Sequence, residues 1–119
     1  MKYLTISALL LAAAWASSAL ADTASVQEAA VERTLVADQG RFGSCMALLD
    51  KELADYGLNC PSRWVSFSCS GEFASKDVAY RMFDSAQLAF ALGHQVTVRV
   101  DDTKKHDGYC YAYMIYVLP

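Results

Sequence analysis

Four cysteines constrain this chain more than any other feature. Cys45, Cys60, Cys69 and Cys110 all follow an N-terminal segment that has the marks of an export signal. An even number of cysteines in a small exported domain predicts two disulfides. Zinc sites need paired C-x-x-C spacing, which the gaps of 14, 8 and 40 intervening residues do not supply. Four cysteines allow three pairings, and their spacing does not select one of them.

Residues 1–21 are predicted to be a signal peptide. Lys2 supplies a positive start, residues 4–14 are almost entirely apolar, and Ala19-Leu20-Ala21 has the small-x-small pattern that precedes a cleavage site. The apolar run is too short and too rich in alanine to favour a membrane span. We therefore expect no membrane insertion, cleavage before Asp22, and export to the periplasm or beyond.

The remaining segment, residues 22–119, has the length of one domain. It holds 13 acidic residues against 9 basic ones, because Lys2 leaves with the signal, so its net charge is −4. Nucleic-acid binding depends on neutralising phosphates with clustered basic side chains, and this segment has no such cluster. Neither nucleic acid nor an anionic membrane surface is an expected partner.

The clearest secondary-structure signal predicts a helix over residues 76–92. Ser75 is a good N-cap, Asp77 lies in the first turn near the positive end of the helix dipole, and Gly93 suits the position after the last turn. Apolar residues recur at the spacing of one helical face, which we expect to pack on the core. These residues are Ala79, Met82, Phe83, Ala86, Ala89 and Phe90.

Five strands are expected around this helix. The criteria are alternation of apolar and polar residues, β-branched and aromatic content, and flanking turn residues. The last two strands should alternate without interruption, with Val96, Val98 and Val100 facing the core. Residues 22–30 are expected to be a loose arm or a short helical start. The predicted strands are residues 34–36, residues 44–50 (a strand in preference to a helix), 63–69, 95–102 and 109–118.

The element order β-β-β-α-β-β predicts the fold class. A single helix between strands 3 and 4 of five strands is the order of an OB-fold, a small and partly open barrel. We therefore expect a mostly β, α+β protein: an OB-like five-stranded antiparallel barrel with two disulfides. A flat sandwich, with the helix lying across an antiparallel sheet, is the alternative.

The segment from Asp101 to Gly108 joins the last two strands and collects three aspartates and His106. Its Asp107-Gly108 pair is strong turn chemistry. Two lysines in the segment stand where calcium ligands would be needed, and no second histidine is near enough in sequence to complete a zinc site. A solvated hairpin loop is expected, with no metal site and no cofactor.

No catalytic residues are assigned. Cysteines paired in disulfides leave no free thiol, and no G-x-S-x-G motif occurs. The expectation is a protein that is not an enzyme. A small hydrolase is the least favoured alternative, and it would place His94 or His106 within hydrogen-bond distance of a serine and a carboxylate.

Aromatic residues provide the candidate binding surface. Tyr109, Tyr111 and Tyr113 share one face of the last strand, opposite the face of Cys110. An exposed row of this kind is uncommon in monomers. Three explanations stay open: the helix or the N-terminal arm covers the row, the row forms a subunit interface, or it is a platform on which sugars stack. Trp64 has the same alternatives.

Residues 83–102, FDSAQLAFALGHQVTVRVDD, form a capped helix that runs through glycine into an alternating strand. They resemble the helix–strand region of the small secreted B subunits of bacterial A–B toxins, the subtilase cytotoxin B subunit type and its typhoid-toxin and pertussis-like relatives. GSCMALLD and WVSFSCS resemble the cysteine-bearing second and third strands of that family. The resemblance extends over residues 31–118.

The resemblance implies an OB-fold, a ring of five copies, a catalytic A-subunit partner, and binding of sialylated or other cell-surface glycans. It also implies the pairs Cys45–Cys69 and Cys60–Cys110. The family's glycan-contacting loop serine has Ser44 as its only candidate counterpart. The alternative function is that of a monomeric periplasmic protein that binds or inhibits another protein through the last strand. The candidate binding residues are Ser44, Trp64, Tyr109, Tyr111 and Tyr113.

Overall fold

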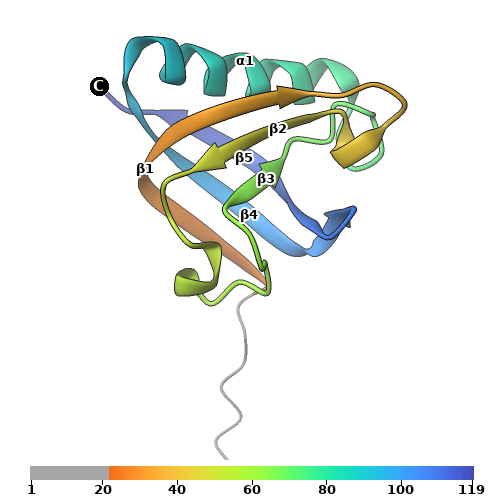
Figure 1. Cartoon of the computed structure of the whole chain (residues 1–119), viewed down its shortest axis with the longest axis horizontal. Coiled ribbons are helices and arrows are strands. Elements are labelled where there is room, and N and C mark those ends of the chain that lie inside the picture. The colour runs from red at the N-terminus through yellow and green to blue at the C-terminus, as the bar shows by residue number, and fades with distance from the viewer. Residues whose placement is uncertain (1–21) are drawn as a thin grey trace, which may run out of the picture.

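The computed structural model describes residues 22–119, and the predicted signal peptide at 1–21 lies outside the described residues. Five strands surround a core, and one long helix covers one side of it (Figure 1). Two short 3-10 turns, η1 (Arg41–Gly43) and η2 (Leu53–Tyr56), lie in the connections. The main elements are β1 (Thr23–Val36), β2 (Cys45–Leu49), β3 (Trp64–Ser66), α1 (Lys76–Leu92), β4 (Gln95–His106) and β5 (Tyr109–Val117).

The strands close into a barrel in the order β1-β2-β3-β5-β4. This order, with α1 between β3 and β4, confirms the predicted OB-like fold. The barrel is not antiparallel throughout, because β3 and β5 run parallel, with Val65 opposite Cys110. A closed ring with an odd number of strands cannot be antiparallel at every seam, so the expected all-antiparallel barrel is corrected to a mixed one.

The helix α1 begins and ends at the predicted residues. The Ser75 side chain accepts a hydrogen bond from the Val78 N–H, and Gly93 adopts a left-handed φ of 71° after the last turn. The apolar stripe is buried against the barrel up to Ala89. Phe90 is an error in the predicted stripe: it is 50% exposed, because in the last turn only Ala89 packs on the core.

Strand β1 is longer than expected, and the predicted loose arm at 22–30 is wrong. Its first half pairs with β4 and its second half with β2. Glu28 has a positive φ of 52° and lies where the register with β4 shifts, which marks a β-bulge. The bulge places both Val26 and Ala29 in the core, three residues apart, so the alternation that signals a strand is broken.

Strand β4 extends to His106, so most of the expected loop before β5 is strand. The inward positions of Val96, Val98 and Val100 are confirmed, since all three are fully buried. Asp107 and Gly108 alone form the turn, both with positive φ, as a two-residue hairpin loop of the I′ type requires. The two strands stay paired beyond Asp101 because their register shifts: residues 102–104 have no partner in β5, and pairing resumes at Lys105.

Strands β3 and β5 depart from the predicted alternation. β3 ends at Ser66 because Ser68 takes a left-handed φ of 61° and leaves the sheet. In β5, a register shift opposite Arg99 and Val100 adds a residue near Tyr113. Ala112 and Ile115 therefore both contact the core, while Met114, which strict alternation would place on the same face as Cys110 and Ala112, is exposed.

Two disulfides close long loops. Cys45 pairs with Cys69 and Cys60 with Cys110, which confirms the two bridges and the pairing that the resemblance implied. Loop-closure entropy assigns roughly 3–4 kcal/mol of stability to bridges of this span. Structural disulfides are typical of an oxidising compartment. Within residues 22–119, no helix has the length and apolar character needed to cross a membrane.

Candidate functional site

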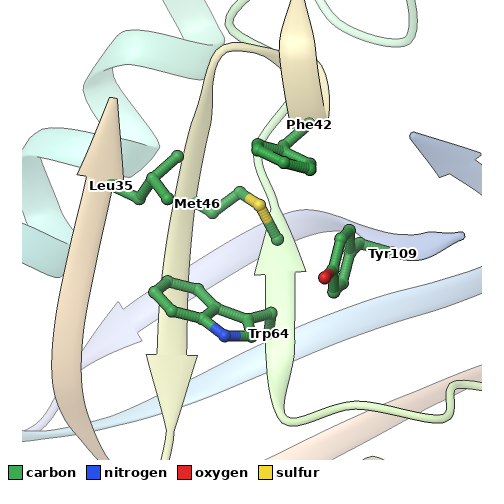
Figure 2. A pocket seen from close by; sticks show the side chains of 5 residues that line it. All are labelled: Leu35, Phe42, Met46, Trp64 and Tyr109. Carbon is green, nitrogen blue, oxygen red and sulfur yellow. The ribbon is translucent and has the colours of Figure 1, made fainter. Parts of the chain in front are cut away.

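A pocket of about 120 Å³ opens on the outer face of the barrel. Figure 2 shows Met46 in its middle, with the other four side chains arranged around it. Each side chain comes from a different part of the chain: β1, the β1–β2 loop, β2, β3 and β5. Three of the five are aromatic. The lining residues are Leu35, Phe42, Met46, Trp64 and Tyr109.

Strand pairing places Met46 and Trp64 on the outside of the barrel. Their neighbours Ala47 and Val65 pair with each other and belong to the buried core. Because side chains alternate along a strand, Met46 and Trp64 point away from that core. Met46 is nevertheless only 2% exposed, since the other lining side chains surround it. Met46 is therefore buried by the side chains that line the pocket and not by the barrel core.

Phe42 is held in place at both ends of its backbone. Its N–H donates to Asp107 Oδ2 at 2.8 Å, and its carbonyl oxygen accepts from Ser66 Oγ at 2.7 Å. Its ring meets Tyr109 edge to face, with centroids 5.6 Å apart. Phe42 has a left-handed φ of 56°, which costs energy for a non-glycine residue unless its surroundings fix it. The two hydrogen bonds supply that fixation.

Gly43 lets this loop approach the barrel closely. A Cβ at this position would collide with Ser66 Oγ and would lie 2.5 Å from Cδ2 of His106. Its φ of +71° also favours glycine. The loop that carries Phe42 therefore rests directly on the His106 ring and on Ser66.

His106 is buried, and its expected place in a solvated loop is wrong. It is 6% exposed, and the Phe73 ring packs against its ring at a tilt of 44°, with centroids 4.5 Å apart. Its Nε2 lies 2.9 Å from Ser68 Oγ, and its Nδ1 lies 3.4 Å from Glu72 Oε2. A serine, a histidine and a carboxylate thus meet in space, which is the arrangement expected of a small hydrolase.

Accessibility distinguishes this cluster from a catalytic triad. In a working triad the serine faces the substrate and the carboxylate is buried behind the histidine. Here Ser68 is fully buried, and its oxygen also accepts the Phe73 N–H at 2.9 Å. The Glu72 carboxylate is the exposed member, with 64% of its side chain accessible. The cluster of Ser68, His106 and Glu72 anchors the segment after β3, and it exposes no nucleophile to a substrate.

The tyrosine row divides into three different environments. Tyr109 lines the pocket, and Tyr111 is 6% exposed beneath Phe73, with ring centroids 5.5 Å apart. Tyr113 accepts a hydrogen bond from Arg99 Nε at 2.9 Å, which raises the pKa of Arg99. Burial, with a smaller contribution from the Asp101 charge, raises the pKa of Tyr111. The row is therefore not a continuous platform.

Ser44 does not line the pocket. Its backbone N–H donates to the Arg41 carbonyl and its carbonyl oxygen accepts from the Ala37 N–H, so that its backbone helps to close the β1–β2 loop. In the part of the chain from 22 to 119, no group of three histidine, cysteine, aspartate or glutamate side chains is placed to hold a metal ion.

Sequence reasoning identified Trp64 and Tyr109 but not their three partners in the pocket. Leu35 and Met46 lie in predicted strands for which no outer face was assigned, and Phe42 lies in a loop. One signal pointed to Phe42: it stands between Gly40 and Gly43, where a bulky aromatic side chain is out of place in a solvated turn.

A second surface lies at another end of the barrel. We call it the uncharged end, because residues 85–98 and 114–119 contain no Asp, Glu, Lys or Arg. Hydrogen bonds between Leu118 and both Gln95 and His94 hold these segments together. In Figure 1 the C-terminus and the end of α1 lie at the left, and the β4–β5 hairpin lies at the right. The large apolar side chains exposed in these segments are Leu88, Phe90, Leu92, Met114, Tyr116 and Val117.

Comparison of the chain with protein-family models, with curated proteins and with solved structures gave no match. We therefore infer the function from the pocket and the uncharged end.

Proposed function

We propose that this protein is an exported, non-enzymatic binding module that recognises glycans through the pocket around Met46. One observation carries the proposal: Phe42, Trp64 and Tyr109, from three separate elements, converge on the outer face of β2 and β3. OB-folds bind oligosaccharides and oligonucleotides with this face and with the loops that join strands 1–2 and 4–5. Phe42 belongs to the first of these loops, and Asp107 of the second holds it.

The chemistry of the lining suits a sugar. Pyranose rings have an apolar C–H face, which packs on aromatic rings, and hydroxyl groups at their edges. Trp64 and Tyr109 each combine an apolar ring with one polar atom, the indole N–H and the phenol oxygen. A mostly apolar pocket with a few polar groups is the usual form of a small-molecule site. A nucleic acid is disfavoured, because the domain is acidic.

Export is part of the proposal. Residues 1–21 have the composition of a signal peptide, and two disulfides suit the oxidising side of a membrane. A function at the cell envelope or outside the cell agrees with the recognition of surface glycans.

Self-association completes the B-subunit-like proposal, with a second copy of this chain as the occupant of the uncharged end. Copies of one chain carry the same net charge and repel each other where like charges meet. The side chains of residues 85–98 and 114–119 reduce this repulsion, since they include exposed apolar groups such as Leu92 and no Asp, Glu, Lys or Arg. Arg99, the cross-strand partner of Met114, is hydrogen-bonded to Tyr113 and Ser25. Exposed apolar surfaces of this kind commonly mark protein interfaces.

A second candidate function is binding of another protein at the same pocket. Leu35 and Met46 give the pocket an apolar side, which also suits an aliphatic or aromatic side chain of a partner. The glycan proposal is preferred because Trp64 and Tyr109 each place a polar atom beside an apolar ring, which suits a sugar with hydroxyl groups at its edges.

A glycan array probed with the labelled, processed protein tests the proposal. We expect retention on a related set of glycans, loss of that retention in Trp64→Ala, and full retention in Tyr80→Ala. Tyr80 is an exposed aromatic residue on α1, outside the pocket. Circular dichroism and thermal unfolding of both variants check that the fold is intact. Retention of no glycan, or retention that Trp64→Ala leaves unchanged, would refute the proposal.

A further inference from the structure

We infer that the pocket takes a neutral sugar that carries a methyl group, either on an acetamido substituent or at a 6-deoxy carbon. This inference rests on the proposed glycan function and narrows it by two properties of the pocket, its charge and its apolar side. The resemblance to toxin B subunits implies a sialylated ligand, which is anionic, so the two expectations differ.

The first property is the charge around the lining. Among residues 22–119, no Lys, Arg, Asp or Glu lines the pocket. The charged group bound to a lining residue is the Asp107 carboxylate, 2.8 Å from the Phe42 nitrogen, and it is negative. A carboxylated sugar would meet repulsion from this group and would find no cation in the lining.

Three arginines near the lining residues, Arg33, Arg41 and Arg63, lie outside the lining itself. Arg63 precedes Trp64, and its guanidinium is occupied: Nη1 lies 2.9 Å from Glu32 Oε2 and also donates to the Leu49 carbonyl oxygen. Arg41 precedes Phe42 but is exposed and is not part of the lining. Arg33 is exposed on the same outer face as Leu35, because it pairs with Leu48, which in turn pairs with Trp64. An anionic sugar would have to recruit Arg33 or Arg41 from outside the pocket, which makes these the two residues to test.

The second property is the apolar side formed by Leu35 and Met46. A plain hexose needs aromatic rings for its C–H face and polar partners for its edges, but it has no methyl group to place on aliphatic side chains. Figure 2 shows Leu35 and Met46 adjacent, beside the Trp64 ring. A methyl group carried by a sugar stacked on Trp64 would contact both side chains. In an apolar pocket one such group is worth about tenfold or more in affinity.

The pocket is large enough to hold only part of one such sugar residue. Its volume of about 120 Å³ is below the range of roughly 300–1,000 Å³ for sites that enclose a whole small molecule. It can receive one face and one substituent of a terminal sugar, and the rest of the ligand stays in solvent. Binding of free monosaccharides is therefore expected to be weak and to depend on the substituent.

Fluorescence of Trp64 provides the test. The chain has two tryptophans, Trp15 and Trp64, so Trp64 is the only tryptophan in the processed protein. N-acetylglucosamine, fucose, glucose and N-acetylneuraminic acid are titrated separately. We expect N-acetylglucosamine, fucose or both to bind about tenfold tighter than glucose. N-acetylneuraminic acid, which carries an acetamido methyl group and a carboxylate, should bind more weakly than the better neutral sugar.

Variants separate the contributions. Leu35→Ala should reduce the preference for the methyl-bearing sugar over glucose. Val36→Ala is the matched control, because Val36 is the next residue in β1 and is 62% exposed outside the pocket. Arg33→Ala and Arg41→Ala should each leave binding of the neutral sugars unchanged.

The failures of the two proposals are distinguishable. N-acetylneuraminic acid binding tightest at Trp64, with loss of that binding in Arg33→Ala or Arg41→Ala, would overturn the neutral-sugar inference and keep the glycan function. Equal binding of glucose and the methyl-bearing sugars would overturn the role of Leu35 and Met46. The absence of any response to all four sugars, together with an array that retains no glycan, would overturn the glycan function itself.

Discussion

The Asp107 carboxylate accepts the backbone N–H of Phe42 at 2.8 Å, and this hydrogen bond joins the β4–β5 turn to the β1–β2 loop. The two residues are 65 positions apart in sequence. Through this bond, a residue that looks like simple turn chemistry positions one wall of the pocket. The turn and the proposed binding site are thus parts of one structure.

Replacing Asp107 by alanine should loosen the Phe42 loop. The change removes the acceptor and leaves a side chain less suited to the positive φ of 51° at this position. We expect the free energy of glycan binding to become less favourable by about 1 kcal/mol, which corresponds to about fivefold weaker binding. Hydrogen exchange of the Phe42 amide should become faster. Asp107→Asn keeps an oxygen acceptor and a residue type that tolerates a positive φ. It should therefore keep most of the glycan affinity and most of the protection of the Phe42 amide from exchange. Unchanged exchange at Phe42 in Asp107→Ala would show that the bond does not hold the loop.

Ser68→Ala tests whether the cluster at His106 is structural. The change leaves the Phe73 N–H and one nitrogen of the buried His106 without their partner, so we expect the free energy of unfolding to fall by about 1–3 kcal/mol. Urea unfolding measures the loss. The hydrolysis rate of p-nitrophenyl acetate should be the same for the wild type and the variant. A wild-type rate above background that Ser68→Ala abolishes would instead support the hydrolase alternative. Ser85→Ala, on α1, controls for the loss of a hydroxyl group.

The sequence predicted those elements whose signals are local. The α1 bounds follow from Ser75 and Gly93, and the valines of β4 follow from unbroken alternation. The errors occur where the chain adds a residue to a strand. Glu28 and Tyr113 lie at register shifts, and each shift changes which face the following residues occupy. A bulge depends on how two strands pair, which the sequence of one strand does not reveal.

The candidate site was only partly predictable for a related reason. Trp64 and Tyr109 stood out because large aromatic residues on an outer face need an explanation. Their proximity depends on the parallel pairing of β3 with β5, and the place of Phe42 depends on its bonds to Asp107 and Ser66. The burial of His106 likewise depends on Phe73 and on contact with the Gly43 loop. These are contacts between segments far apart in sequence.

Tyr111 should make the protein less stable in alkali. Burial raises its pKa above the ordinary value of 10.0, so in that pH range the folded state keeps a proton that the unfolded state has lost. The stabilising contribution is full below pH 10.0 and is lost as the pH rises through the higher pKa of the folded state. Tyr111→Phe should therefore show a smaller fall in unfolding free energy between about pH 8 and about pH 11 than the wild type. Urea unfolding at several pH values measures the difference, with Tyr116→Phe as the exposed control. An identical fall in the wild type and in Tyr111→Phe would argue against the buried phenol as its source.

Leu92→Asp should weaken self-association. Leu92 is 62% exposed in the uncharged end, and a carboxylate there would meet its own copy across a symmetric interface or the apolar surface of a neighbour. We expect light scattering on a sizing column to give an oligomer for the wild type and a lower native mass for the variant. Val36→Asp introduces the same charge at a residue of equal exposure outside this end and should leave the mass unchanged. A wild-type protein that is monomeric across the concentration range would contradict the proposed assembly.

The most direct test of the binding proposal is the indole N–H signal of Trp64 in a nitrogen–proton NMR spectrum of the processed protein. Trp64 is the only tryptophan after residues 1–21, so one indole signal reports on the pocket. Titration with the glycans retained on the array should shift this signal in a saturable way, together with the amide signals of Phe42 and Tyr109. A glycan that binds while the indole signal and these amides stay in place would locate the site elsewhere and contradict the account.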